Sequence, residues 1–148
     1  MNQSPRKGID YTGISVTFFC HDGNGKFVMG RRSANTRDEQ GKWEIGAGSM
    51  EFGDTAERTL FKEIREEYCA DVLEYEFLGY MDALREHEGI QTHWVTLNFK
   101  ARVDPEKVKI GEPDMIDEIR WFAFDTLPPA EELHSQLPAF FERYREKL

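Results

Sequence analysis

The sequence predicts an α+β fold in which helices pack on a mixed β-sheet. Apolar and polar residues alternate over residues 14–20 and again over residues 92–103, which is the pattern of half-buried strands. Between them, residues 54–68 carry apolar side chains at the period of an α-helix. The resulting order of strands, helix, strands and a second helix favours α+β over an all-α or all-β fold.

The chain has 148 residues, which suits a single domain with one main core. We expect residues 1–10 to form a flexible polar arm and residues 11–148 to form the domain, because no repeat or linker divides them. With 39% hydrophobic and 32% charged residues, the composition is that of a folded soluble protein. The polar N-terminus contains no apolar signal segment, so we expect a cytoplasmic protein that does not associate with membranes.

The net charge of −9 argues against a nucleic-acid partner, since the phosphate backbone attracts basic surfaces. A small anionic substrate is compatible with this charge if carboxylates hold a divalent cation, which reverses the local sign of the field. Cys20 and Cys69 have no metal-binding spacing. We expect both to be buried thiols in a reducing compartment.

The N-terminal half is expected to form strands that meet at turns. The alternating residues 14–20 are followed by the turn sequence HDGNGK and a short apolar run at 27–29, which predicts a hairpin. Residues 31–42 are polar and aperiodic and are interpreted as a loop. Residues 43–45 then lead into a Gly-rich turn at 46–54.

The first helix is predicted over residues 54–68, where the apolar residues recur at intervals of four: Ala56, Leu60, Ile64 and Tyr68. Asp54 and Glu57 have the spacing of a capping box at its start. The predicted strands that follow lie at 75–84, 92–103 and 118–124, the first two as a hairpin. Leu137, Phe140, Phe141 and Tyr144 form the apolar stripe of a terminal helix.

Three carboxylates on the first helix, those of Glu63, Glu66 and Glu67, share one face beside the apolar stripe. Like charges at this spacing repel, so the cluster calls for a cation, a proton or solvent. Oxygen ligands of this kind suit Mg²⁺, Mn²⁺ or Ca²⁺ and not zinc. The competing interpretation is an acidic solvated face, neutralised by the basic residues Arg58, Lys62 and Arg65.

The segment from Gly48 to Ala70, GSMEFGDTAERTLFKEIREEYCA, resembles the box of the Nudix hydrolase family, G-x5-E-x7-R-E-U-x-E-E-x-G-U, with U a bulky aliphatic residue. The residues that match are Gly48, Glu63, Ile64, Glu66 and Glu67. The residues that depart are Asp54 for Glu, Lys62 for Arg, Cys69 for Gly and Ala70 for a larger aliphatic residue. Before the box, Gly46-Ala47-Gly48 stands where Pro-Gly-Gly is common. Because Gly takes the αL conformation without strain, Cys69 implies either a strained residue or a helix that ends differently.

The resemblance implies a MutT-like α/β/α sandwich with a mixed β-sheet between helices. It also implies metal-dependent hydrolysis of a nucleoside diphosphate linked to another group. By the same resemblance, Glu63, Glu66, Glu67 and the backbone carbonyl of Ala47 hold the metal, which is Mg²⁺ with Mn²⁺ as the second choice. One of the Glu residues acts as the base in some members, and the sequence does not select it.

A further acid is expected after the box, and Glu118 is the first candidate, ahead of Asp117 and Asp114. For each of them, a solvated loop acid is an equally good interpretation. Arg31, ahead of Arg32, is the candidate for contacting phosphate, against the interpretation of a surface charge.

Gly48 and Phe18 are assigned to substrate binding, with Phe19, Trp94 and Phe124 as further stacking candidates. Aromatic residues in alternating strands are more often part of the core, and this interpretation stays open for each of them. His93 shares the apolar face of its strand and is interpreted as a buried, hydrogen-bonded histidine.

The loop SMEFGDT most resembles the branch of the family that hydrolyses nucleoside triphosphates, including oxidised ones, to the monophosphate and diphosphate. Nucleotide sugars are the main rival substrates. The sequence also allows a catalytically silent nucleotide-binding module or an acidic domain without metal. The nucleobase, the leaving group, the number of metal ions and the choice between monomer and homodimer stay open.

Overall fold

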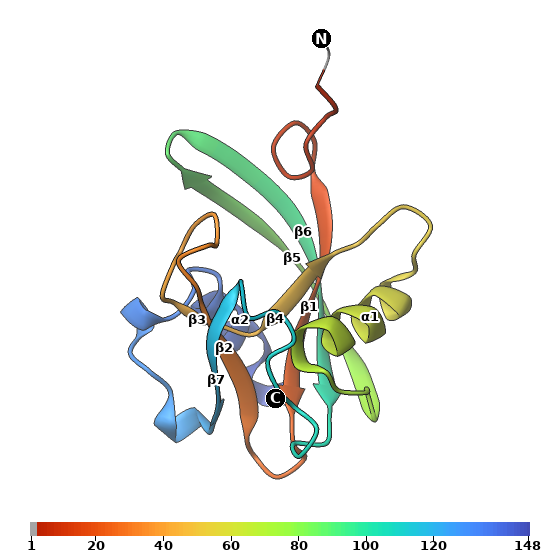
Figure 1. The fold of residues 1–148 in the computed structure, drawn as a ribbon, viewed down its shortest axis with the longest axis vertical. Helices are drawn as coiled ribbons and strands as arrows, with labels where there is room; N and C mark the ends of the chain where they lie inside the picture. The colour runs from red at the N-terminus through yellow and green to blue at the C-terminus, as the bar shows by residue number, and fades with distance from the viewer. Residues whose placement is uncertain (1–2) are drawn as a thin grey trace.

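The computed structural model describes residues 3–148 and shows a mixed sheet with a helix on each face (Figure 1). The strands are β1 (Gly13–His21), β2 (Phe27–Arg32), β3 (Trp43–Glu44), β4 (Gly46–Ser49), β5 (Glu74–His87), β6 (Ile90–Arg102) and β7 (Ile116–Phe122). The helices are α1 (Ala56–Tyr68) and α2 (Leu137–Tyr144). Short 3-10 turns lie at 124–126, 130–132 and 145–147.

The order of strands in the sheet is β3-β2-β1-β6-β5, with β4 beside β1 and β7 beside β2. β1 and β6 run parallel from the pair Gly13–Trp94 to the pair His21–Arg102, and the other pairs of strands are antiparallel. β5 and β6 form the predicted second hairpin, closed by Glu88 and Gly89 with positive φ angles. The predicted α+β class with a mixed sheet is therefore confirmed.

The first predicted hairpin differs from the observed pairing. Within residues 3–148, β1 and β2 pair at His21–Phe27 alone and then separate. The N-terminal part of β1 pairs instead with β4, which the sequence suggested was a turn, and β2 pairs with β3 and β7. Ile45 lies between β3 and β4. At this residue the chain changes its pairing partner, because β3 pairs with β2 whereas β4 pairs with β1.

Two apolar layers lie on opposite faces of the sheet. On one face, Leu60, Ile64 and Tyr68 of α1 pack against strand residues such as Val16 and Phe18. On the other face, the predicted stripe of α2 packs against a second set that includes Phe19, Phe27 and Met29. Alternation along β1 therefore supplies both layers, and the predicted α/β/α sandwich is confirmed.

The ends of α1 depart from the capping prediction. Thr55 is the N-cap, and its Oγ1 accepts a hydrogen bond from the Arg58 N–H at 3.0 Å. Asp54 forms ion pairs with Lys62 at 3.1 Å and with Arg58 at 3.7 Å. Cys69 ends the helix in the αL conformation with φ of 57°, so of the two predicted options the residue is the strained one.

Part of the predicted N-terminal arm is folded against the domain. Gly8 N–H donates to Tyr11 O at 2.7 Å, and His93 N–H donates to Gly8 O at 2.8 Å. Lys7 Nζ lies 2.7 Å from a carboxylate oxygen of Glu51. These contacts fix residues 6–11 beside β6 and the β4–α1 connection, whereas Met1 and Asn2 lie outside the described residues.

No helix in the range 3–148 is both long enough and apolar enough to span a bilayer.

Candidate active site

Glycines on β4 let the α1 carboxylates approach the sheet. A Cβ built on Gly48 would overlap the side chain of Glu63. A Cβ built on Gly46 would lie 2.5 Å from Glu67 Oε2 and would also overlap Phe18. Gly46 and Gly48 are therefore required because the two carboxylates lie directly against the β4 backbone.

Glu67 is the most enclosed of these acids. Burial raises the pKa of Glu67 well above its usual value, and the carboxylates of Glu44 and Glu112 raise it further, opposed by a hydrogen bond from the Ala47 N–H. Its Oε2 is sealed from solvent and has no hydrogen-bond partner in the part of the chain that the structure describes. A buried oxygen of this kind is unfavourable unless a ligand or a proton satisfies it.

Glu63 and Glu66 complete the cluster at the edge of the core. Burial raises the pKa of Glu63 to about 7, with a further contribution from the negative charge of Glu66. Glu66 itself is exposed. The cluster therefore pairs two destabilised carboxylates with one solvated carboxylate on a single helix face.

Glu112 is a fourth acid, which no sequence pattern indicated. The loop after β6 docks on the C-terminus of α1, where Lys109 N–H donates to Tyr68 O at 3.0 Å and Gly111 N–H donates to Glu67 O at 2.9 Å. A Cβ on Gly111 would overlap the Glu66 carbonyl, so the approach requires glycine. The loop thus places Glu112 close enough to raise the pKa values of both Glu63 and Glu67.

The acid predicted at Glu118 lies elsewhere. Glu118 is on β7 opposite Arg31, forms an ion pair with it at 3.6 Å and also contacts Arg120. Asp114 accepts hydrogen bonds through its backbone carbonyl, and both Asp114 and Asp117 are exposed. None of these three side chains lines the cavity beside the carboxylates. Asp114 and Asp117 are therefore solvated acids, and Glu118 is an ion-pair partner.

Of the two arginines at the end of β2, Arg32 and not the first candidate Arg31 lies in the cavity wall. Arg31 pairs with Glu118 and lies over the ring of Trp43 at 5.8 Å. Arg32 lines the cavity and forms an ion pair with Glu44 at 3.0 Å. The register of β2 against β7 shifts between Arg31 and Arg32, which is a bulge and changes the direction of the following side chain.

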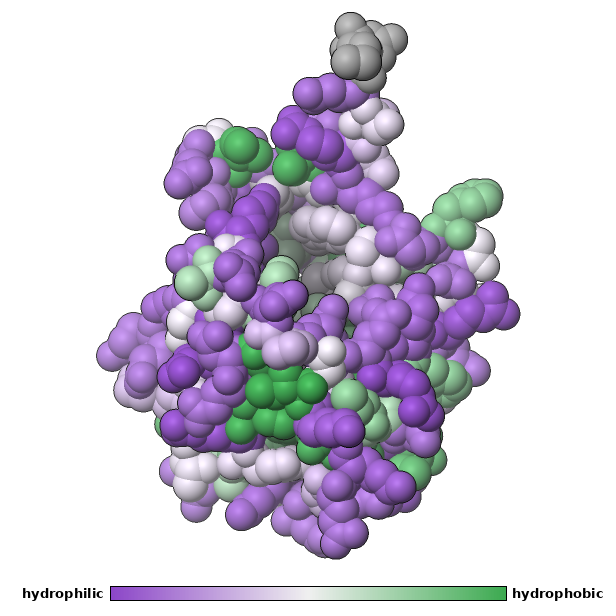
Figure 2. Space-filling view, viewed as in Figure 1, coloured by the Kyte–Doolittle hydropathy of each residue, from purple (hydrophilic) through white to green (hydrophobic). Residues whose placement is uncertain are grey.

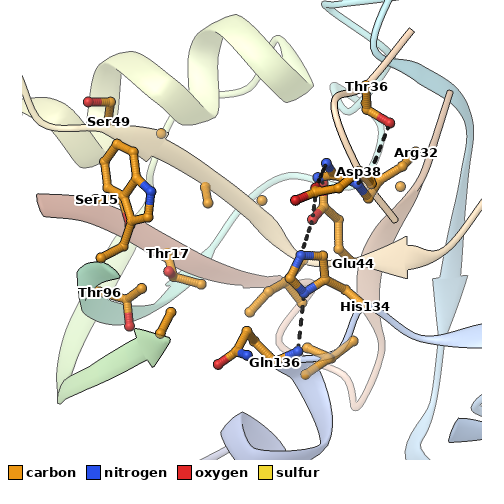
Figure 3. A pocket seen from close by; sticks show the side chains of 18 of the residues that line it. Ser15, Thr17, Arg32, Thr36, Asp38, Glu44, Ser49, Thr96, His134 and Gln136 are labelled. Carbon is orange, nitrogen blue, oxygen red and sulfur yellow. Dashed lines mark hydrogen bonds and ion pairs between the residues drawn. The ribbon is translucent and has the colours of Figure 1, made fainter. Parts of the chain in front are cut away.

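A cavity of about 630 Å³ extends across the sheet from Glu67 and Glu112, whereas Glu63 and Glu66 lie outside its lining. Figure 2 shows the molecule hollowed between the β5–β6 hairpin and the β4–α1 connection. Figure 3 shows the hydroxyls of Ser15, Thr17 and Thr96 on one side and the charged group around Arg32 on the other. The volume is within the range of small-molecule sites.

One of the predicted stacking residues lines this cavity. Trp94 is part of its wall, whereas Phe18 and Phe19 are almost completely buried in the two apolar layers and Phe124 packs at the edge of one layer. The assignment of Phe18 to substrate binding is therefore wrong, because its side chain faces α1. His93 is hydrogen-bonded as predicted, to Asp82 at 2.8 Å, but its side chain is 41% exposed.

Cys20 is buried as predicted, and Cys69 is partly exposed. Both cysteines are free thiols.

The site has the donor set that a hard divalent cation requires. Carboxylate oxygens dominate it, one of them buried without a partner, and the glycines leave space along β4. Within residues 3–148, no three acidic, histidine or cysteine side chains converge closely enough to enclose a cation as they stand. Glu63, Glu66, Glu67 and the Ala47 carbonyl would be the ligands once the side chains turn toward a common centre.

A network of ion pairs forms the charged wall of the cavity. Asp38 lies 3.0 Å from Arg32 and 3.1 Å from Arg85. Glu39 lies 2.6 Å from Arg85 and 3.0 Å from His134 Nε2. These pairs join the β2–β3 loop to β5 and to the segment before α2. Figure 3 shows Asp38 beside Arg32. The wall is therefore held from three separate parts of the chain.

Replacing Glu39 by Gln should destabilise the protein by about 1–3 kcal/mol at pH 7, since charged hydrogen bonds in a partly buried site are lost. Burial alone would raise the pKa of Glu39, but His134 and Ser135 outweigh it and hold the pKa well below the usual value. Because the pKa of Glu39 is lower in the folded protein than its unfolded value of 4.5, the ionised carboxylate stabilises the fold above pH 4.5. This stabilisation is lost as the pH falls toward the folded-state pKa. Urea unfolding of both proteins from pH 7 to pH 3 measures the difference, which should shrink below pH 4.5. A constant difference over this range would contradict the assignment.

A carboxylate cluster at the mouth of a cavity, on an α/β/α sandwich, is suited to hydrolysis of phosphate anhydrides. The model of the NUDIX domain family matches residues 12–144, and the chain therefore belongs to the NUDIX family.

Solved structures of this family share the fold. The crystal structure of a MutT NUDIX hydrolase from Burkholderia pseudomallei has a TM-score of 0.77 at 22% identity, covering 90% of this chain and 98% of that one. That of a MutT protein from Methanosarcina mazei Go1 has a TM-score of 0.76 at 23% identity, covering 92% of this chain and 94% of that one.

The curated relatives include proteins named NAD-capped RNA hydrolase NudC from two strains of Pseudomonas aeruginosa, each 27% identical over 128 residues. The match covers 86% of this chain but only 43% of each relative's length.

Proposed function

We propose that this protein hydrolyses a nucleoside triphosphate, oxidised forms included, to the monophosphate and diphosphate, with Mg²⁺ or Mn²⁺ as cofactor. The observation that carries the proposal is the buried, unpartnered oxygen of Glu67, among acidic neighbours and beside a cavity of nucleotide size. A bound cation would offset the repulsion among these acids and the negative charge of the diphosphate at once.

Each part of the chain has a distinct role in this proposal. Glu63, Glu66, Glu67 and the Ala47 carbonyl would hold the metal, which supplies charge neutralisation and activation of water. Glu112 lines the cavity from the opposite loop, and we assign to it the acceptance of the proton from the attacking water. Lys7 Nζ lies 3.1 Å from Ser49 Oγ in the wall next to β4, where its charge is paired with Glu51.

Two competing functions have specific tests. A nucleotide sugar presents the same nucleoside diphosphate to the same carboxylates, so only the products separate it from a triphosphate. A catalytically silent nucleotide-binding module would bind without turnover, and retention of Glu63, Glu66 and Glu67 argues against it. The printed name of the NudC relatives adds NAD and NAD-linked RNA to the substrates that need testing.

The first experiment incubates the protein with nucleoside triphosphates, nucleotide sugars, NAD, ADP-ribose and dinucleoside polyphosphates, with and without Mg²⁺ or Mn²⁺. We expect metal-dependent release of a monophosphate and diphosphate from a triphosphate, and its loss in Glu66→Gln, with products identified by chromatography. Release of a sugar phosphate from a nucleotide sugar instead would replace the triphosphate proposal. No turnover by folded protein on any substrate would support the silent module.

The cytoplasmic location, the absence of a nucleic-acid partner and the homodimer stay predictions. The dimer has an available surface, because Tyr80 and Leu84 are 57% and 68% exposed on β5, which ends the sheet. Light scattering during size-exclusion chromatography measures the mass directly.

A further inference from the structure

The part of the cavity farthest along β6 has a composition unlike that of the carboxylate end. Thr92, Trp94 and Thr96 project from β6 into its lining, beside Ser15 and Thr17 of β1. Strand periodicity places these β6 residues on one face and the apolar residues Val95 and Leu97 on the other. A surface of hydroxyls around one large ring can contact a planar polar ligand by stacking and by hydrogen bonds.

Thr92 carries the observation that points to a ligand. Its side chain is only 4% exposed and lies in the cavity lining, and its Oγ1 has no hydrogen-bond partner among residues 3–148. By contrast, the hydroxyl of Thr96, four residues along the same face, donates to Met81 O at 3.2 Å. An unpaired buried hydroxyl is unfavourable in the free protein, and a bound polar group would satisfy it.

Trp94 is held in place by the N-terminal turn. The backbone of Gly8 and Gly13 packs directly against its ring, so that a Cβ on Gly13 would lie 2.6 Å from Trp94 Cε3. Gly8 is in turn fixed by the hydrogen bond between its carbonyl and the His93 N–H, at 2.8 Å. The indole is thus oriented by the N-terminal turn and the first residue of β1, and its ring forms part of the cavity wall.

The charges of the cavity argue that this end takes an uncharged ring and not a phosphate. The basic residues in the lining are each paired with an acid: Lys7 with Glu51, Arg32 with Glu44, Arg37 with Asp38 and Arg85 with Glu39. A phosphate placed here would therefore compete with pairs already formed. The diphosphate is better accommodated by a cation at the α1 carboxylates.

We propose that Trp94 and Thr92 form the subsite for the nucleobase, with Gly8 and Gly13 as positioning residues for the indole. The ring of the base stacks on Trp94, and rotation of the Thr92 side chain brings its Oγ1, which is closed to solvent in the free protein, to a polar group of the base. This inference deepens the proposed function, on which it rests for the presence of a nucleoside. It assigns recognition of the base to the N-terminal turn and β6, outside the segment that carries the carboxylates.

Calorimetric titrations of AMP, GMP, CMP and UMP test the subsite, with ribose 5-phosphate and inorganic diphosphate as probes that lack a base. We expect the wild type to bind at least one monophosphate, and ribose 5-phosphate at least tenfold more weakly. Trp94→Leu should weaken binding of that monophosphate about tenfold or more, since stacking is lost. Its binding of diphosphate with Mg²⁺ should be unchanged.

Thr92→Val separates a role in binding from a role in folding. Because the hydroxyl has no partner in the free protein, the variant should unfold at the same temperature or a higher one. It should nevertheless bind the monophosphate about three- to tenfold more weakly. Thr59→Val removes a buried hydroxyl outside the cavity, one that donates to Thr55 O, and should bind like the wild type. Gly13→Ala should reproduce the Trp94→Leu defect and raise KM for the nucleotide more than it lowers kcat.

The outcomes distinguish this inference from the proposed function. The subsite would be overturned, even if hydrolysis is found, by either of two results. One is that folded Trp94→Leu and Thr92→Val bind the monophosphate as tightly as the wild type does. The other is that the wild type binds ribose 5-phosphate as tightly as the monophosphate. Failure of the wild type to bind any monophosphate would also overturn it. Base-dependent binding that needs Trp94 and Thr92, without turnover, would uphold the subsite and reject the hydrolase.

Discussion

Glu67→Gln is expected to lower metal-dependent hydrolysis by about a thousandfold while the protein stays folded. The variant keeps the size of the side chain and removes the charge that the buried Oε2 would bring to a cation. Because burial and neighbouring acids raise the pKa of Glu67, neutralising it should also make the metal-free protein more stable at pH 8. Initial rates at saturating Mg²⁺ and thermal unfolding of the metal-free proteins measure the two effects.

The control for this prediction is Glu142→Gln, which neutralises an exposed acid on α2. It should leave both the rate and the metal-free stability unchanged. Saturating Mg²⁺ should stabilise the wild type, by about 2.7 kcal/mol at a hundredfold excess over Kd, and should stabilise Glu67→Gln much less. Full activity of Glu67→Gln would remove this residue from the metal site.

The second large effect is expected for Gly111→Ala. The new Cβ would overlap the carbonyl of Glu66, which belongs to the helix backbone and cannot rotate away. The loop must then move outward and weaken the hydrogen bond from Gly111 N–H to Glu67 O. We expect a loss of about 1–3 kcal/mol of unfolding free energy from overpacking, and a loss of activity because Glu112 is displaced with the loop.

Urea unfolding and steady-state kinetics test this variant against two others. Gly30→Ala adds a methyl group 3.1 Å from a flexible methyl of Ile116 and should have a smaller effect on stability. Glu112→Gln should lower kcat without loss of stability, because only the acid is changed. Wild-type kinetics in Glu112→Gln would show that the loop acid is not needed for proton transfer.

The fold was predictable because its main signals are local. The alternation over β1 and β6 and the helical period over α1 are patterns that neighbouring residues set by themselves. The apolar side chains of these patterns are buried in the two layers of the core, as predicted. The α1 carboxylates were predictable for the same reason, since helix geometry alone brings Glu63, Glu66 and Glu67 to one face.

The features that sequence patterns did not predict depend on contacts between distant segments. Nothing in the local sequence shows that the loop carrying Glu112 docks on α1, although Gly111 is a signal for such a close approach. The presence of Arg32 in the cavity wall in place of Arg31 follows from a bulge set by pairing with β7. Strand β4 was interpreted as a turn because glycines usually mark turns, whereas here they make room for carboxylates.

The early separation of β1 from β2 has an evolutionary consequence. The cavity lining includes residues from both sides of the sheet: Glu67 of α1 on one side, and Trp94 and Asn98 of β6 on the other, where Asn98 donates to Tyr144 of α2. Under the proposed function, substitutions on β6 and the N-terminal turn would change the preferred base, and the α1 carboxylates proposed to hold the metal would be inherited unchanged.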